Sequence, residues 1–185
     1  MPYFDTVRHI QFDEMESFEH TRLKPLSISL AVDSDSAKVL DIQVGTLNYK
    51  GRLAGFAYTK YGPRIDTSET AMQRVLETLK EAGISNPIIK TDSKTTYPKL
   101  VSRILPQAVH VPVKVERVSM VQRLFRKGRR NENDPLFVLN YMAAKIRHDV
   151  SRMARKVWVT TKKDSFLQAH LDLYMAYING YALPR

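Results

Sequence analysis

The sequence predicts an α/β fold in which helices pack on both faces of a five-stranded mixed sheet. Strand-like segments crowd the first quarter of the chain, two short apolar segments each follow a helical pattern, and two amphipathic helical patterns close the chain. The predicted order, β-β-β-α-β-α-β-α-α, places three antiparallel strands before two parallel ones. Because the 185 residues contain no repeat or linker, we predict one domain, residues 1–185.

The first three strands follow from hydrophobic alternation. Residues 9–15 form a short segment with acidic residues at its end. In the next segment, Leu26, Ile28, Leu30 and Val32 alternate with small residues, which is the period-two pattern of a half-buried strand. Residues 33–36 have turn composition, and residues 39–44 form the third strand. Short connections of this kind favour an antiparallel meander.

The middle of the chain alternates helix and strand. Residues 48–66 are predicted to be a loop, and a helix follows whose apolar stripe is completed by Gly83 at its C-terminal cap. The segment 87–92 is a short buried strand, and residues 97–105 form a helix. Residues 109–113 make the fifth strand, and its proline favours an edge position.

The last third is predicted to hold a basic loop at 116–133 and a long helix at 135–157. Asp134 is its expected N-cap and Pro135 its first helical residue. Apolar residues repeat at intervals of three or four along that helix, so one face belongs to the core. A final helix buries Leu167 and Leu171.

Composition narrows the class of protein. A mean hydropathy of -0.33 and the lack of a long apolar run predict no membrane span, and we see no signal peptide. The absence of cysteine excludes disulfides and thiolate zinc sites and fits a cytoplasmic location.

The net charge of +10 is concentrated in one segment. Residues 114–163 carry 14 Lys and Arg against 4 Asp and Glu, while the rest of the chain holds 15 of each kind. A confined positive field indicates a polyanionic partner, of which nucleic acid is the commonest. The alternative is a solvated basic face that serves solubility.

Asp13 and Asp92 stand at the predicted carboxyl ends of the first and fourth strands, where ligand sites gather in open α/β sheets. If those strands are neighbours, the two carboxylates converge and repel unless a cation or a proton separates them. Mg²⁺ suits such a site, because it takes oxygen ligands and often uses one or two carboxylates together with substrate phosphates. The alternative is that both residues cap loops or face solvent.

Four stretches together resemble the catalytic region of bacterial insertion-sequence transposases. They are residues 13–21 with 24–27 (DEMESFEHT, KPLS), residues 90–93 followed by Tyr97 and Pro98 (KTDS, YP), residues 134–140 (DPLFVLN), and residues 152–163 (RMARKVWVTTKK). The resemblance covers nearly the whole chain in order. It implies a ribonuclease H-like core of the DDE type, in which two Asp and one Glu bind Mg²⁺ or Mn²⁺. Water then cleaves the DNA at the element end, and the freed 3′-hydroxyl attacks target DNA.

Carried over by the resemblance, Asp13 is the first acid and Asp92 the second. The third position departs from the pattern, because Asn140 stands there. We predict catalytic and metal-binding roles for all three, although an amide is a weaker ligand than a carboxylate. Asn140 bonded to nearby backbone is the alternative, and the other acids that we considered are Glu16, Glu116, Glu132 and Asp149.

The predicted partner is double-stranded DNA, both element ends and target, held by a homo-oligomer as the resemblance implies. The predicted phosphate contacts are Arg147, Arg152, Arg155, Lys156, Lys162 and Lys163. A solvated helix end is the alternative reading for these cations.

Only twelve residues precede Asp13, so we expect a separate DNA-binding chain to recognise element ends, or the chain to be a fragment or a decayed copy. The alternative functions are a catalytically impaired or domesticated DNA-binding relative and a ribonuclease H-like nuclease or resolvase.

Overall fold

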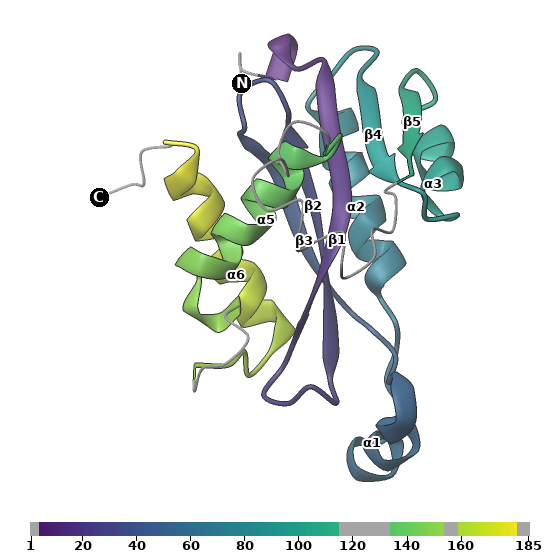
Figure 1. Ribbon diagram of the computed structural model, residues 1–185, viewed down its shortest axis with the longest axis vertical. Coiled ribbons are helices and arrows are strands. Elements are labelled where there is room, and N and C mark those ends of the chain that lie inside the picture. The colour runs from purple at the N-terminus through teal and green to yellow at the C-terminus, as the bar shows by residue number, and fades with distance from the viewer. Residues whose placement is uncertain (1–3, 115–133, 154–158, 181–185) are drawn as a thin grey trace, which may run out of the picture.

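The computed structural model describes residues 4–114, 134–153 and 159–180, and it is built around one five-stranded sheet (Figure 1). The strands are β1 (His9–Phe18), β2 (Pro25–Asp33), β3 (Val39–Thr46), β4 (Ile88–Asp92) and β5 (Val109–Val113). Their order across the sheet is β3-β2-β1-β4-β5. The first three strands pair antiparallel, and β4 and β5 add to β1 in parallel, so the predicted α/β fold with a mixed sheet is confirmed.

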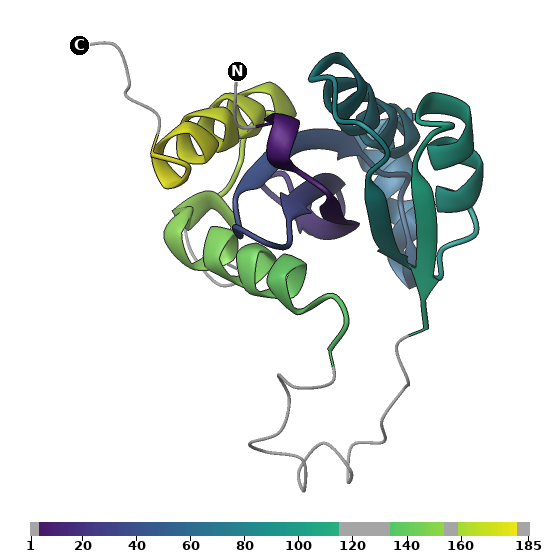
Figure 2. The ribbon, with the colours of Figure 1, turned by 90° about the horizontal axis from the view of Figure 1, so that it is seen from above.

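Helices cover both faces of the sheet, as Figure 2 shows. They are α1 (Ala54–Tyr61), α2 (Ser68–Glu81), α3 (Tyr97–Ile104), α5 (Phe137–Asp149) and α6 (Asp164–Ile178), with short 3₁₀ turns at Phe4–Thr6, Gly51–Leu53 and Ser151–Met153. One core lies between the sheet and α2 and α3, and the other between the sheet and α5 and α6. Among the described residues, no helix is long and apolar enough to cross a membrane.

The strand β2 is buried along nearly its whole length because it lies between the two helical layers. Leu26, Ile28 and Leu30 face the α5 and α6 side, and the residues between them are small enough for α2 to pack closely on the other side. The sequence predicted a half-buried strand, since Ser27 and Ser29 were read as solvent-facing. The edge position predicted for the fifth strand is confirmed, and Pro112 there is exposed.

Two predicted segments were wrong in part. The loop predicted at 48–66 contains the helix α1, which lacks an apolar stripe and buries only Ala57. The helix predicted at 135–157 with Asp134 as its N-cap begins instead at Phe137, after Leu136 as N-cap, because Asp134 and Pro135 belong to the turn that precedes it. It ends at Asp149, because the backbone of Val150 turns to an extended conformation with ψ 98°. That turn carries Val150 and Met153 into the core beside α6, so the predicted apolar positions are buried although the helix is shorter.

Gln11 fastens the start of α5 to the sheet. Its side chain is buried on β1, where Oε1 accepts a hydrogen bond from the Leu139 N–H at 2.9 Å and Nε2 donates to the Pro135 carbonyl at 3.2 Å. The N–H groups of a first helical turn have no partner within the helix, so a glutamine from a neighbouring strand satisfies one of them here. This contact fixes the height of α5 above β1.

We predict that Gln11→Met lowers the free energy of unfolding by about 1–3 kcal/mol, because it keeps the volume but leaves a buried N–H and a carbonyl without their partner. Urea denaturation measures this change. Gln107→Met is the control, since Gln107 is exposed and its change should stay within about 0.5 kcal/mol. Equal stability of Gln11→Met and the wild type would show that these bonds do not anchor α5.

Candidate active site

Asp13 lies in the middle of β1, and not at its carboxyl end as the sequence predicted. The pairing with β2 continues to Phe18, whereas the parallel pairing with β4 ends at Gln11 opposite Lys90. Asp13 therefore stands just past the point where β1 and β4 part. It lies opposite Leu30 on β2 and shares the face of the sheet that α5 covers.

Asp92 reaches the same point from β4, as its last residue. Asp92 and Asp13 each lie two residues past the last paired residues, Lys90 and Gln11, so they stand on the two sides of the opening between the strands. Its Oδ1 accepts a hydrogen bond from the Lys94 N–H at 2.9 Å, which orders the turn that follows. The prediction that these strands are neighbours is confirmed, and the two carboxylates lie close enough to influence each other's charge.

The environment of Asp13 disfavours its negative charge. Burial raises the pKa of Asp13 most, and the charges of Asp92 and Glu14 raise it further. Two donors oppose this effect, since Oδ1 accepts from the Glu14 N–H at 2.7 Å and from the Tyr97 hydroxyl at 2.9 Å. The net pKa stays above its ordinary value, so an added cation would stabilise the charged form.

Tyr97 is the residue of this site that the sequence did not single out. It is fully buried at the start of α3 and meets the Phe12 ring edge to face, with centroids 5.2 Å apart. Burial and the charges of Asp13 and Glu14 raise the pKa of Tyr97, so its hydroxyl stays protonated and donates. A tyrosine five residues after a strand-end aspartate was visible in the sequence, but nothing in the pattern indicated its direction.

Glu14 points to the other side of β1 from Asp13. It accepts hydrogen bonds from the Ser27 hydroxyl and the Lys94 ammonium, and the Tyr97 hydroxyl lies 3.4 Å from its Oε2. Lys94 thus compensates the charge of Glu14. We therefore assign Glu14 a structural role beside the site, because these donors already occupy its carboxylate oxygens.

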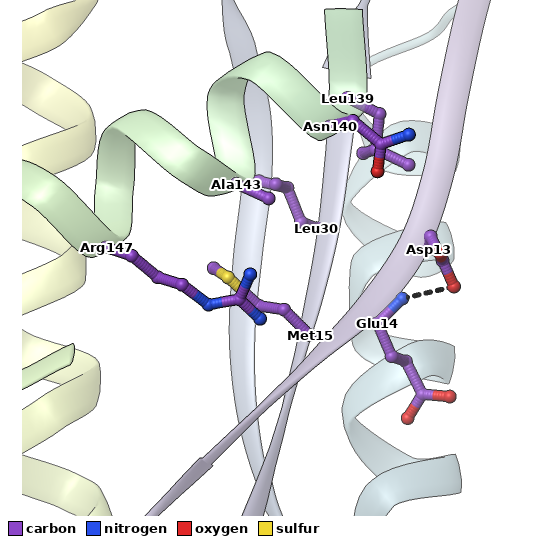
Figure 3. A pocket seen from close by; sticks show the side chains of 8 residues that line it. All are labelled: Asp13, Glu14, Met15, Leu30, Leu139, Asn140, Ala143 and Arg147. Atoms are coloured by element: carbon purple, nitrogen blue, oxygen red, sulfur yellow. Dashed lines mark hydrogen bonds between the residues drawn. The ribbon is translucent and has the colours of Figure 1, made fainter. Parts of the chain in front are cut away.

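A cleft of about 220 Å³ lies between α5 and the strands β1 and β2 (Figure 3). Asn140, Ala143 and Arg147 lie on successive turns of α5 and face the sheet across it. The small Ala143 leaves space in the centre. The lining residues are Asp13, Glu14, Met15, Leu30, Leu139, Asn140, Ala143 and Arg147.

Asn140, which we predicted to be the third ligand, lies on the wall of this cleft. Its amide nitrogen donates to Asp134 Oδ2 at 2.8 Å, outside the cleft. That bond sets the orientation of the amide and leaves its oxygen on the cleft side, as Figure 3 shows. Arg147 extends from the next turns of the helix toward Met15. The predicted alternative, an asparagine bonded to backbone, does not describe this side chain.

The remaining candidate residues are dispersed. Glu16 pairs with Lys50 at the surface, and Asp149 is bound by Lys145, His148 and Tyr174, which lower its pKa. Neither lies in the cleft. Glu116 and Glu132 fall outside the described residues.

The predicted phosphate contacts also separate. Of the four that the structure describes, Arg147 alone lines the cleft. Arg152 is half-buried in the 3₁₀ turn after α5, and the exposed Lys162 and Lys163 directly precede α6. Arg155 and Lys156 lie outside the described residues.

The donor set fits a divalent cation that keeps open positions. No three His, Asp, Glu or Cys side chains in the described ranges gather as a complete metal site. Two neighbouring carboxylates with one amide oxygen nearby match Mg²⁺, which takes few protein ligands and fills its octahedron with water or phosphate oxygens. Burial, and to a smaller extent the charges of Asp92 and Glu14, raise the pKa of Asp13, and a cation bound beside it would lower that pKa again.

The comparisons with known proteins add no relative. The chain matches no family model, and no curated protein matches it closely enough to count as one.

We predict that Mg²⁺ at about ten times its Kd stabilises the wild type by about 1.4 kcal/mol, which raises the thermal midpoint by about 3–6 °C. Asp13→Asn and Asp92→Asn should each abolish this shift. Asparagine keeps the oxygen that accepts the hydrogen bonds and removes only the charge.

Differential scanning fluorimetry with and without Mg²⁺ measures the effect. Asp35→Asn is the control, because Asp35 is exposed and pairs with His9 at a distance from the cleft, so its variant should retain the shift. A shift that survives in Asp13→Asn would place the cation elsewhere.

Proposed function

We propose that this chain is the catalytic domain of a DNA transposase with a ribonuclease H-like core, which cleaves and joins DNA strands in a reaction that requires Mg²⁺ or Mn²⁺. One observation carries the proposal. Asp13 and Asp92 stand on neighbouring strands just past the point where β1 and β4 part, and Asp13 lines a cleft that α5 covers. The sheet order and the resemblance of the motifs around both acids support the same conclusion.

The residues of the chain divide the work in this proposal. A bound divalent cation would supply a Lewis acid that holds a DNA phosphate against the carboxylates. The Tyr97 hydroxyl donates to Asp13 and so orients its carboxylate. Lys94 forms an ion pair with Glu14, so the carboxylate of Glu14 would not compete for the cation. Arg147, on the opposite side of the cleft, faces the negative charge that gathers on the attacked phosphate.

The activity is tested by two assays on the full chain with Mn²⁺: nicking of supercoiled plasmid, and joining of a labelled duplex with a free 3′-hydroxyl to that plasmid. The duplex ends in the sequence found at the boundary of the element that encodes the chain. We expect both reactions, and we expect Asp13→Ala and Asp92→Ala to slow each by more than about 100-fold.

Asp35→Ala is the control and should keep full activity. Nicking without joining would favour a nuclease or resolvase. Activity that is unchanged in both the Asp13 and the Asp92 variant would remove the two carboxylates from the reaction.

A second candidate rests on Asn140, which is neutral where a third acid is expected. In this alternative the chain is a catalytically impaired or domesticated relative that binds DNA without cutting it. It predicts DNA binding that does not depend on metal and no nicking with any divalent cation.

The role of Asn140 is tested by exchanging it with its partner. Asp134→Asn combined with Asn140→Asp preserves the hydrogen bond between the two side chains and moves the charge to the cleft. We expect Mg²⁺ to bind about tenfold more tightly in this double variant and about tenfold more weakly in Asn140→Ala, because charge count tunes cation affinity. Calorimetry measures the Kd, and equal values in all three proteins would exclude Asn140 as a ligand.

A further inference from the structure

Residues 48–65, here named the α1 arm, project from the body of the sheet. Figure 1 shows α1 at the lower end of the molecule, away from the other helices. The arm connects β3 to α2 and buries only Ala57 of its helix. Packing in the core therefore does not explain why the chain contains this segment.

Both ends of the arm are firmly held. The Tyr49 hydroxyl donates to the Gly62 carbonyl at 3.0 Å, which closes the base of the arm. The Arg64 guanidinium donates to the carbonyls of Leu47 and Pro25 and to the buried carboxylate of Glu19. These bonds fasten the arm to the connection between β1 and β2, to the first residue of β2 and to the residue after β3, so its base is a fixed part of the fold.

The arm is basic and contains no acid. It carries Lys50, Arg52, Lys60 and Arg64, and no Asp or Glu occurs between residues 42 and 65. Two of these cations are used internally, since Lys50 pairs with Glu16 and Arg64 with Glu19. Arg52 and Lys60 are exposed and form no ion pair with any residue of the described ranges.

Large apolar side chains lie beside these cations. Leu53 is 58% exposed, Phe56 56% and Tyr58 58%. Lys60 lies over the Phe56 ring, 5.9 Å from its centroid, and 5.4 Å from that of Tyr61. Phe56 with Lys60 beside it combines two features: a π face on which a flat group can stack, and a positive charge for the phosphate next to it. Tyr58, two residues further along the helix, exposes a second ring in another direction.

We infer that the α1 arm binds single-stranded DNA, with unpaired bases stacked on Phe56 and Tyr58 and the adjoining phosphates on Arg52 and Lys60. A duplex offers its phosphates but keeps its base faces internal, so exposed rings gain little from it. A second copy of the chain is a poorer occupant, because a symmetric contact through this surface would oppose Arg52 and Lys60 of both copies. The choice of DNA as the polymer rests on the proposed function.

The test is fluorescence anisotropy with labelled oligo(dT) of about 20 nucleotides, compared with a blunt duplex of equal length. It uses the full chain carrying Asp13→Asn, in EDTA, so that no cleavage or metal binding contributes. We expect Phe56→Ala with Tyr58→Ala to weaken binding of the single strand by about tenfold or more and to leave duplex binding unchanged. Phe56→Leu with Tyr58→Leu keeps the apolar volume and should show the same loss.

The charge pair gives a second readout. Arg52→Gln with Lys60→Gln should lower the slope of log K against log salt by about 1.4 for the single strand, since each phosphate contact contributes about 0.7. The matched control is Leu173→Ala with Tyr177→Ala, which removes an equally exposed apolar pair from α6 and should change neither readout.

Unchanged binding of the single strand in the ring variants would overturn the inference, as would an equal loss on the duplex. It would also be overturned if the wild type were a dimer in solution and the ring variants monomers, because the arm would then be a protein interface. These measurements do not involve strand nicking, so a negative result for binding would not contradict the proposed function. Likewise, a chain that does not nick DNA could still bind single strands through the α1 arm.

Discussion

Three residue pairs between β1 and β4 decide where the site can be. His9, Ile10 and Gln11 pair in parallel with Ile88, Ile89 and Lys90, and the two strands then separate. The separation opens the sheet where both strands present an aspartate. Because Tyr97 enters this opening from the α3 side and Gln11 holds α5 over the other face, the two helical layers meet the carboxylates from opposite directions.

Bringing Asp13 and Asp92 to the same opening of the sheet costs free energy, because their negative charges repel each other. Two carboxylates side by side, one of them largely buried, repel each other and raise the pKa of Asp13. Only two hydrogen bonds to its Oδ1 offset this repulsion, whereas Glu14 nearby is compensated by Lys94. A charge that the protein leaves partly uncompensated in a cleft is typical of a site that binds a charged ligand, and a structural carboxylate would be paired as Glu14 is.

Much of the fold could be predicted from the sequence, because strands and helices each repeat their apolar residues at a characteristic spacing. Alternation along β2 and the spacing of Leu139, Met142 and Ile146 identify the elements without knowledge of their neighbours. The convergence of Asp13 and Asp92 was predicted only on the condition that their strands are neighbours, and the order of the strands in the sheet meets that condition.

What failed depended on tertiary contacts. The end of α5 is set by the burial of Val150 beside α6, and α1 has no stripe to identify it. Tyr97 reaches Asp13 because β1 and β4 separate beside it and leave room for its side chain. The end of α5 and the place of Tyr97 depend on contacts distant in the sequence, whereas α1 was missed because its own residues lack the periodicity of an amphipathic helix.

Asn140 is neutral, and its lack of charge can be understood from the charges that surround the cleft. Asp13 and Asp92 contribute two negative charges to the site, and Arg147 across the cleft contributes one positive charge. A third carboxylate would add repulsion to a group whose pKa is already raised, and the fold would bear that cost whenever no cation is bound. An amide supplies an oxygen without this cost, and its nitrogen uses Asp134 to hold the orientation. Under the proposed function, Asn140 would exchange cation affinity for stability of the cation-free protein, a compromise that fits a site whose remaining ligands come from the substrate.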